Sequence, residues 1–259
     1  MDTKQLVQQQ FGATAAAYAT SKVHAQGASL ARLVELVQPQ ADWQVLDIAT
    51  AAGHTAFIFA PHVAHVVASD ITPEMLAVAQ EQAAKKGITN ATTQLADAED
   101  LPFADKSFDL VTCRIAPHHF PHIDRFLAES ARVLKAGGTL AVVDNITPDD
   151  RQAADYVDGI ERLRDPSHVH CLSLAEWRSA FSAAGITLLH EELADKAMEF
   201  LDWARRMKIS NEVESELRQL FLNAPASVVE FLTPQPVGED LHFVLKEAIL
   251  IGQKPALVV

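Results

Sequence analysis

The chain has 259 residues, of which 49% are apolar and 21% charged, as in an ordinary globular protein that can bury a large core. Its 34 acidic and 21 basic residues give a net charge of -13, and no run of Lys and Arg exceeds two residues, which excludes the basic footprint that nucleic-acid binding needs. The sequence shows no apolar signal segment, no uncharged apolar stretch of membrane-spanning length and no Cys/His metal-ligand spacing, so we expect a reduced cytoplasmic protein outside membranes.

The chain begins with a helical pattern and continues with alternating strands and helices. Residues 3–38 carry apolar side chains at helical spacing, interrupted near Thr20-Ser21, and predict two short helices that end before Pro39. Strands are then predicted at residues 43–48, 65–70, 91–96, 108–113 and 139–146. The helices between them are predicted to run to Pro61, from Thr72-Pro73 to Gly87, and over residues 122–134.

After residue 150 the alternation becomes less regular. We expect a helix to about residue 164, a helix from Ser173 with Glu176 completing a capping box, and a strand after Gly185. Helical segments are predicted over about 197–222, and the apolar run Leu241–Ile251 is predicted to return to the sheet as an edge or antiparallel strand. This order predicts an α/β fold whose mostly parallel, doubly wound sheet has helices on both faces.

The residues that follow the first predicted strand form a loop of small side chains. Ligands of such sheets bind beyond the carboxyl ends of the strands. The segment from Asp47 to His54 resembles the Asp-x-Gly-x-Gly-x-Gly loop of class I methyltransferases, with Ala49 and Ala51 at the first two glycine positions and Gly53 at the third. A pyrophosphate needs close approach of the backbone, whereas S-adenosylmethionine has no phosphate, so the extra methyl groups are easier to tolerate. The alternative interpretation is a tight strand-to-helix turn.

Carboxylates follow the next two predicted strands. Asp70 ends the second strand, where an acidic group accepts hydrogen bonds from both ribose hydroxyls of an adenosine ligand. An N-cap aspartate is the alternative, but Thr72 is expected to cap that helix. Asp97 follows the third strand, where the exocyclic amine of adenine would lie, and a plain turn residue is the alternative.

Taken together, these segments resemble the ubiquinone/menaquinone-biosynthesis-like (type 11) methyltransferases, and within them the YcgJ-like subgroup. The matching segments are Val45–Thr55, Ala68–Ala79, Asp97–Phe103, Ser107–Phe120, Arg132–Asp144 and Arg162–His168. The resemblance implies a Rossmann-like class I fold and S-adenosylmethionine as cofactor, with S-adenosylhomocysteine as product. It assigns Asp70 to the ribose, Asp97 and Ala98 to adenine, and the Asp47–Gly53 loop to the methionine part. The candidate cofactor-binding residues are Tyr18, Ser21, Asp47, Ala49, Ala51, Gly53, His54, Asp70, Ile71, Met75, Asp97, Ala98 and Arg114.

Two adjacent histidines follow the fourth predicted strand, in a loop that starts at Arg114. The loop lacks the Asn/Asp-Pro-Pro-aromatic turn that cradles a planar amino group in DNA and protein amide methyltransferases, which disfavours such acceptors. Histidine suits proton removal at neutral pH, so His118 and His119 are the candidate bases, with His119 preferred. The alternative is that they only orient the loop. We expect no metal here, because adjacent histidines on a loop rarely bind one ion.

A second polar cluster follows the fifth strand. Pro166 ends a helix, and the break gathers arginine and histidine side chains that suit an anionic or polar acceptor. Arg164, His168 and His118 are therefore the candidate substrate-binding residues, and a solvated helix terminus is the alternative interpretation.

The N-terminal segment precedes the first strand and is predicted to close over the cofactor. Residues 1–38 are assigned to an N-terminal helical lid, with residues 1–25 as its closing part, and 39–259 to the methyltransferase domain. Tyr18 and Ser21 are expected near the cofactor, because excluding water strengthens electrostatics around a sulfonium. A simple surface helix is the alternative.

The predicted function is methyl transfer from S-adenosylmethionine to a small organic molecule, through an O, C or N atom that the sequence does not resolve. A protein that binds the cofactor without catalysis is an alternative, and a nicotinamide-dependent oxidoreductase is a third, disfavoured because Gly-x-Gly-x-x-Gly is missing after the first strand. The expected partner is a small-molecule acceptor, and the oligomeric state stays open, with a homodimer among the options.

Overall fold

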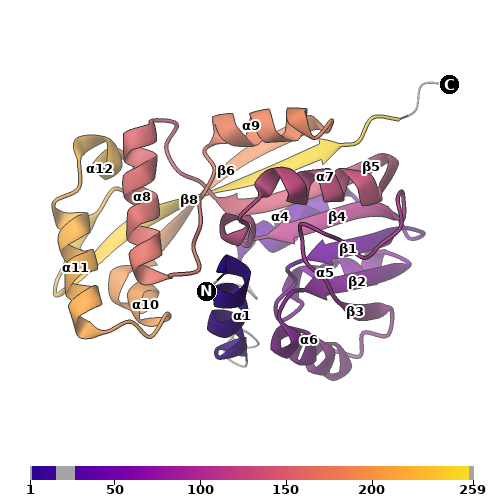
Figure 1. Cartoon of the computed structure of the whole chain (residues 1–259), viewed down its shortest axis with the longest axis horizontal. Coiled ribbons are helices and arrows are strands. Elements are labelled where there is room, and N and C mark those ends of the chain that lie inside the picture. Colours follow the sequence, from indigo (N-terminus) through magenta and orange to yellow (C-terminus); the bar gives the residue numbers. More distant parts are fainter. Residues whose placement is uncertain (1, 16–26, 257–259) are drawn as a thin grey trace.

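The computed structural model describes residues 2–15 and 27–256. In this part of the chain, eight strands form one sheet with the order β3-β2-β1-β4-β5-β8-β6, and β7 pairs with β8 (Figure 1). Strands β1 to β5 run parallel, whereas β8 is antiparallel to both β5 and β6. None of the helices in these residues combines the length and apolarity needed to cross a lipid bilayer.

The first half of the chain forms the parallel part of the sheet, as the sequence predicts. Its strands are β1 Gln44–Ile48, β2 His65–Asp70, β3 Ala91–Leu95, β4 Phe108–Arg114 and β5 Leu134–Asn145. The connecting helices are α5 His54–Phe59, η1 Ala60–His62, α6 Pro73–Lys85, η2 Pro117–His119 and α7 Ile123–Val133. Residues Val45–Ile48 of β1 and all but one residue of β4 are buried, because helices cover both faces of the sheet.

The helices form two layers with separate apolar cores. On one face, α7 and α9 (Leu174–Ala183) bury Phe126, Trp177 and Phe181 against the sheet. Leu33 and Phe59 lie in the core of the other face, with α4 (Ala28–Val37) and α5. Helix α4 therefore belongs to a helical layer of the sheet and not to a lid. Of the predicted lid of residues 1–38, the described part that remains is α1 (Thr3–Gly12) with the few residues next to it.

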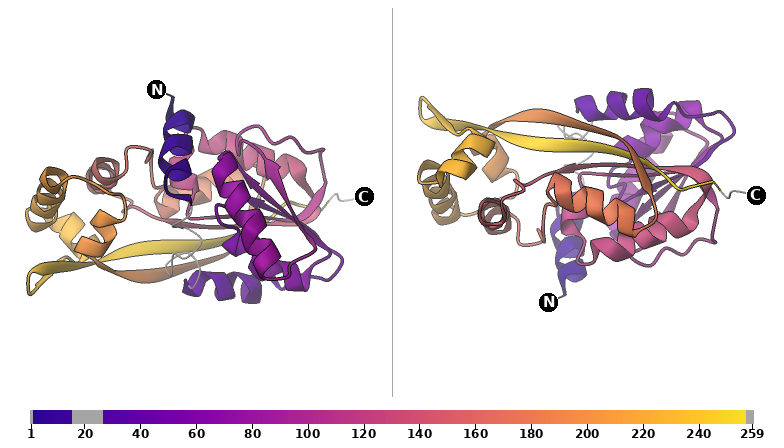
Figure 2. Two further views of the ribbon diagram at one scale, coloured as in Figure 1. Left: turned by 90° about the horizontal axis from the view of Figure 1, so that it is seen from below. Right: turned by 90° about the horizontal axis from the view of Figure 1, so that it is seen from above.

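The C-terminal part of the chain extends the sheet into a helical insertion. Strands β6 (Thr187–Glu199) and β8 (Asp240–Gln253) pair along almost their whole length and carry the insertion at the end remote from β3 (Figures 1 and 2). The last strand is antiparallel, as predicted, but β6 and not β8 forms the edge of the sheet. The insertion contains α8 Arg151–Arg164, α10 Phe200–Arg205, α11 Asn211–Leu222, α12 Ala226–Leu232 and β7 Gln235–Val237.

The insertion has a core of its own. Trp203, Phe221 and Phe243 pack edge to face or tilted at ring-centroid distances of 4.5 to 5.7 Å, and the inner side of α8 joins them. Helix α1 lies between this insertion and the helices α5 and α6 (Figure 1). The arrangement leaves a cavity beneath α1, beyond the carboxyl ends of β1, β2 and β4.

Candidate active site

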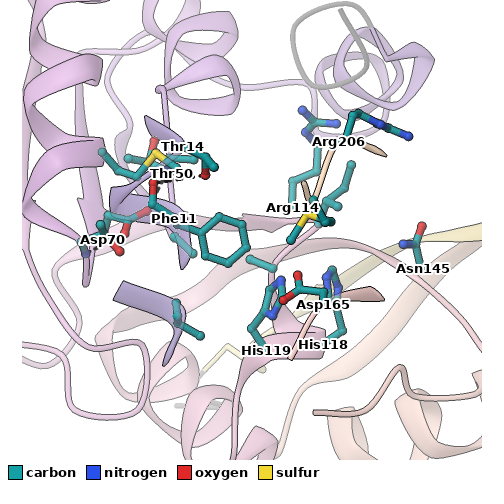
Figure 3. A pocket seen from close by; sticks show the side chains of 18 of the residues that line it. Phe11, Thr14, Thr50, Asp70, Arg114, His118, His119, Asn145, Asp165 and Arg206 are labelled. Carbon is teal, nitrogen blue, oxygen red and sulfur yellow. Dashed lines mark hydrogen bonds between the residues drawn. The ribbon is translucent and has the colours of Figure 1, made fainter. Parts of the chain in front are cut away.

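A cavity with a volume of about 400 Å³ lies where the fold predicts a ligand site. One end is lined by the loop after β1 and by residues after β2, and the other end by β6, α8 and α10. Phe11 of α1 projects into the middle, and Figure 3 shows its ring between Asp70 and the two imidazoles of His118 and His119. We refer to these parts as the β1–β2 end and the insertion end.

The loop after β1 adopts the conformation of a glycine-rich loop although two of its residues are alanines. Ala49 and Ala51 have φ of 53° and 48°, and Gly53 has φ of 85°. A Cβ atom on Gly53 would lie 2.3 Å from the Phe57 ring, so glycine is required there for space as well as for conformation. Ala49, Ala51 and His54 line the cavity, whereas Gly53 shapes the turn behind them.

Asp47 organises this loop from inside the protein. Its buried carboxylate accepts hydrogen bonds from the hydroxyls of Thr50 and Thr112, both at 2.6 Å, and from the Ala56 N–H at 3.1 Å. Burial raises the pKa of Asp47 to about 6, against the opposing effect of these hydrogen bonds. The sequence analysis placed Asp47 among the cofactor-binding residues, but it does not line the cavity, because its oxygens are directed to the loop.

Asp70 lies at the end of β2 and faces the β1–β2 end of the cavity. Its Oδ2 accepts the Ala51 N–H at 2.9 Å and its Oδ1 accepts the Thr72 N–H at 2.9 Å. Burial raises its pKa while these backbone donors lower it. Thr72 occupies the N-cap position of α6, but its side chain makes no capping hydrogen bond. Asp70 lines the cavity, and Ile71 and Met75 add apolar walls beside it.

Asp97 and Ala98 line a second, smaller cavity of about 40 Å³ that shares Ala49 and Ile71 with the large one. Lys4 of α1 reaches into this region, and its Nζ lies 2.6 Å from Asp97 Oδ2 and 2.6 Å from Glu99 Oε2. At about 10–15 Å³ for each water molecule, the smaller cavity has room for about three of them. A planar base can enter it only if α1 shifts.

His118 and His119 lie side by side on η2, with ring centroids 4.2 Å apart. His118 Nδ1 lies 2.6 Å from Asp144 Oδ1, and the His118 N–H donates to Asp144 Oδ2 at 2.9 Å. His119 Nδ1 lies 3.0 Å from the Ser167 carbonyl oxygen, which can only accept. Both rings thus donate from Nδ1, and in the neutral form both carry the free lone pair on Nε2.

The electrostatic surroundings of the two histidines shift their pKa values in opposite directions. Burial lowers the pKa of His118, but the carboxylates around it, Asp144 above all and then Glu161 and Asp165, more than offset burial, so the net shift is upward. Burial and the neighbouring His118 hold the pKa of His119 well below its usual range. His118 is therefore the stronger base of the pair.

His168 does not reach the cavity, contrary to its prediction as a substrate-binding residue. Its Nε2 lies 2.7 Å from the buried Asp158 carboxylate, and its ring stacks on His118 at 5.5 Å. Asp158, His168 and Cys171 form the one cluster among the described residues with metal-ligand spacing. Asp158 also accepts hydrogen bonds from His170 and from the Cys171 N–H, and burial raises the pKa of the Cys171 thiol, so the cluster works as a hydrogen-bonded support for His118.

Of the other predicted site residues, some line the cavity and some lie in the undescribed part of the chain. Arg114 was predicted to bind the cofactor and Arg164 to bind the substrate, and both line the cavity. Ile115, next to Arg114, has φ of 53°, which for a β-branched residue is a strained conformation of the kind that gathers at functional sites. Tyr18 and Ser21 lie outside the described residues, so their predicted place near the cofactor stays a prediction.

The sequence analysis missed the residues that β5, the β6–β8 pair and the insertion bring to the cavity. These are Asn145, Lys196, Met198, Trp203, Arg206, Met207, Lys208 and Leu245. The alternation of exposed and partly buried residues in β6 marks an edge strand but carries no sign of a ligand site. The cluster Arg205-Arg206-Met-Lys208 was the one local signal, as a group of basic residues in an acidic chain.

Comparisons with known proteins agree on one family. Residues 46–142 match the model of a methyltransferase domain. The uncharacterized methyltransferase YcgJ of Bacillus subtilis is 35% identical over 246 residues, which cover 94% of this chain and 97% of YcgJ. The crystal structure of YcgJ superposes on this chain with a TM-score of 0.85 at 34% sequence identity, and the match covers 88% of this chain and 98% of that chain. A candidate methyltransferase from Bacillus halodurans C-125 gives a TM-score of 0.86 at 33% identity, covering 89% of this chain and 100% of its own. The ubiquinone/menaquinone biosynthesis C-methyltransferase UbiE of Brucella canis is 45% identical over 100 residues, 37% of each chain.

Proposed function

Because this chain belongs to the methyltransferase family that includes YcgJ, and is thus a class I S-adenosylmethionine-dependent methyltransferase, we propose that it methylates a small organic acceptor bound in the large cavity. The position of Asp70 carries the proposal, since this buried carboxylate lies beyond β2 beside a glycine-type loop. The cavity volume of about 400 Å³ fits a small-molecule site.

The cofactor would lie at the β1–β2 end of the cavity. Asp70 would accept the ribose hydroxyls, and Ile71 and Met75 would provide the apolar walls of the adenosine site. The loop from Ala49 to His54 would hold the methionine part, and Asp97 the adenine amine once α1 has moved. S-adenosylmethionine supplies an electrophilic methyl group on a sulfonium, which is a good leaving group.

The protein's own part in the reaction is then to align the acceptor and to remove a proton from it. His118 is the proposed base: its Nδ1–H is held by Asp144, which leaves Nε2 as the acceptor of the proton and stabilises the imidazolium that forms. His119, which the sequence analysis preferred, has the lower pKa and would act as a neutral neighbour that shapes the site.

Binding of the cofactor tests the proposal directly. In calorimetric titrations, S-adenosylmethionine and S-adenosylhomocysteine should bind the protein, and Asp70→Ala should weaken both by about 10²-fold or more, because two hydrogen bonds to a charged group are lost. Glu81→Gln on the exposed side of α6 is the matched control. Unchanged affinity in Asp70→Ala, with unfolding temperatures that show both variants folded, removes Asp70 from the site.

Transfer of the methyl group is tested with the small-molecule fraction of a cell extract. Incubation with S-adenosylmethionine that carries a deuterated methyl group should add that label to a small molecule, detected by mass spectrometry. His118→Gln should reduce labelling by about 10²–10⁴-fold and leave the affinity for S-adenosylhomocysteine nearly unchanged. If the wild-type protein binds the cofactor and labels nothing, the alternative of a non-catalytic binding protein stands in its place.

A further inference from the structure

The insertion end of the cavity carries most of the positive charge in the site. Across the whole cavity the described lining includes five cationic side chains and two carboxylates, in a chain whose net charge is -13. Arg164, Lys196, Arg206 and Lys208 all lie at the insertion end. The carboxylates are Asp70, at the opposite end, and Asp165, whose Oδ1 is bonded to the N–H and hydroxyl of Ser167.

Two of these cations are matched by buried carboxylates behind the cavity wall. Arg164 donates to Glu161 Oε2 from Nε at 3.1 Å and from Nη2 at 2.8 Å. Lys196 Nζ lies 3.3 Å from Glu247 Oε2 and 3.1 Å from Asn145 Oδ1. These pairs are structural, and they fix the positions of both side chains.

The other two cations lie on the turn after α10, at the mouth of the cavity. The Lys208 ammonium makes no hydrogen bond and no ion pair with any residue in the described ranges 2–15 and 27–256. Arg206 has partners: its Nε donates to the Asp202 carbonyl oxygen at 3.4 Å and lies 3.5 Å from a carboxylate oxygen of the same residue. Lys208 has φ of 54°, so the turn holds it in a left-handed conformation at the rim. Lys208 thus gives the mouth a positive charge that no carboxylate among the described residues matches, and clefts lined by positive charge concentrate anions.

Apolar side chains line the same end of the cavity. Met198, Met207 and Leu245 lie beside the cations, and Lys196 is the register partner of Leu245 in the β6–β8 pair. Trp203 contributes its ring beneath the Arg164 guanidinium, which lies 4.5 Å from the ring centroid. A ligand that fits this end needs an apolar body and an anionic group directed to the mouth.

We propose that the methyl acceptor is an amphipathic organic anion, whose carboxylate or phosphate is bound by Lys208 and Arg206 and whose apolar body lies against Met198, Met207 and Leu245. The inference rests on the proposed methyl transfer and specifies its substrate class. The reactive atom then lies between the cavity mouth and the β1–β2 end, where His118 lines the wall. Carboxylates and phosphates share the anionic oxygens that Lys and Arg recognise.

The test uses the full chain saturated with S-adenosylhomocysteine and three probes that differ in one group. Hexanoate, hexyl phosphate and hexanol are titrated calorimetrically at low and at physiological salt. Both anions should bind at least about tenfold more tightly than hexanol, because each gains a hydrogen bond between charged groups. Their affinities should fall as salt is added. The stronger of the two anions identifies the headgroup.

A matched pair of lysine variants locates the anion. Lys208→Met should weaken binding of the better anion by about tenfold, and Arg206→Met should do so as well. Lys106→Met is the control, because Lys106 is also an exposed turn lysine with a left-handed φ, of 57°, and the change in net charge is the same, but it does not line the cavity.

The outcomes separate this inference from the proposed function. If S-adenosylhomocysteine does not bind, the proposed function fails and the acceptor class fails with it. If it binds while hexanol binds as tightly as the anions, or while no anion binds at millimolar concentration, methyl transfer stands and the anionic acceptor is overturned. Equal effects of Lys208→Met and Lys106→Met also overturn it, since the anion would then respond only to net charge.

Discussion

His118 and His119 are neighbours in the sequence, yet their imidazoles have opposite electrostatic surroundings. Asp144 at the end of β5 bonds both the ring and the backbone N–H of His118. His119 has the Ser167 carbonyl and hydroxyl on its Nδ1, and its ring lies against His118 and, at 5.0 Å, against Phe11. The Asp144 carboxylate therefore distinguishes two identical side chains and makes His118 the proposed base.

The pKa values of the two rings provide a prediction that needs no acceptor. In an NMR titration, the pKa of His118 should lie above 6.5, and Asp144→Asn should lower it, because the carboxylate that opposes burial most strongly is then lost. His119 should stay neutral well below pH 6.5. As a base, His118 must be neutral, so the rate should rise with pH through its pKa, and this rise should move to lower pH in Asp144→Asn.

The exposed Asp155 on α8 provides the control for that experiment. Asp155→Asn removes the same charge at a distance and should leave both titrations unchanged. A His118 titration that does not move in Asp144→Asn would show that the carboxylate has no part in setting the pKa of the ring.

The alanines of the β1 loop lead to a prediction about stability. Ala51 has φ of 48°, a conformation that costs an L-residue about 1–2 kcal/mol. Ala51→Gly removes this cost and adds about 0.5–1 kcal/mol of backbone entropy loss on folding, so the free energy of unfolding should rise by up to about 1 kcal/mol. Gly53→Ala should lower it by about 2 kcal/mol or more, since its Cβ would overlap the Phe57 ring. Denaturant unfolding measures both, and a loss of stability in Ala51→Gly contradicts the strain.

At the scale of the element, α1 is held over the cavity by a few side chains. Lys4 bridges Asp97 and Glu99, Gln8 donates to the Ile71 carbonyl at 2.8 Å, and Phe11 rests on His119. No residue of α1 is buried, so these contacts and not an apolar core fix its position. Such an element is suited to move when a ligand enters.

We predict that Lys4→Met loosens α1 in the free protein. Hydrogen exchange of residues 3–12 should become faster, and S-adenosylhomocysteine should associate about threefold faster, because a partly exposed ion pair of modest strength no longer opposes the opening. Lys85→Met, which breaks an exposed pair with Glu81, is the control. If the amides of α1 exchange at the wild-type rate in Lys4→Met, the ion pairs of Lys4 do not hold α1 in place and other contacts do.

The sequence was sufficient for those parts of the fold and site that depend on local order. Strand β2 is followed directly by its turn and α6, so the place of Asp70 at a strand end could be predicted from its neighbours alone. The role of Asp47 could not, because its hydrogen bond to Thr112 comes from a strand 65 residues away. The prediction for His168 failed for another reason: its partner Asp158 lies only 10 residues earlier on α8, but the sequence does not show that the chain turns the imidazole back onto that helix and away from the cavity.

The residues that line the insertion end of the cavity could not be predicted from the sequence, because only the topology of the fold brings them together. Lys196 meets Leu245 only through the register of two long antiparallel strands, and neither strand pattern fixes that register by itself. Lys208 reaches the mouth because the core of the insertion sets the position of α10. A local pattern of basic residues marks the turn but does not say which cavity it faces.

At the scale of the whole molecule, the sheet and the insertion have separate apolar cores joined by the β6–β8 pair (Figure 2). The sheet core is larger and is buried from both faces, whereas the insertion core is enclosed by short helices. Units of this kind open with different free energies. We therefore expect amides of α10 to α12 to exchange faster than those of β1, β4 and β5.

Phe221→Ala should weaken the insertion selectively. The ring contacts Trp203, Phe200 and Phe243, and its removal should destabilise this core by about 3–5 kcal/mol. Hydrogen exchange should accelerate in α8 and in α10 to α12, while the affinity for S-adenosylhomocysteine stays within about threefold of wild type. Leu222→Ala, at the exposed neighbouring position, should change neither quantity. Equal acceleration in β1 and β4 would mean that the chain unfolds as one cooperative unit.

The β6–β8 pair also bears on how such a protein diversifies. The β1–β2 end of the cavity comes from residues 49–75, within the segment that matches the methyltransferase domain, while Lys196 and Lys208 come from the hairpin extension and the helices it carries. Mutation, insertion or recombination in the β6–β8 pair and the helices it carries can change the lining of the mouth and leave the turns after β1 and β2 intact. The fold therefore allows the lining of the mouth to change during evolution while the rest of the cavity is kept. The same segment is suited to grafting in protein engineering.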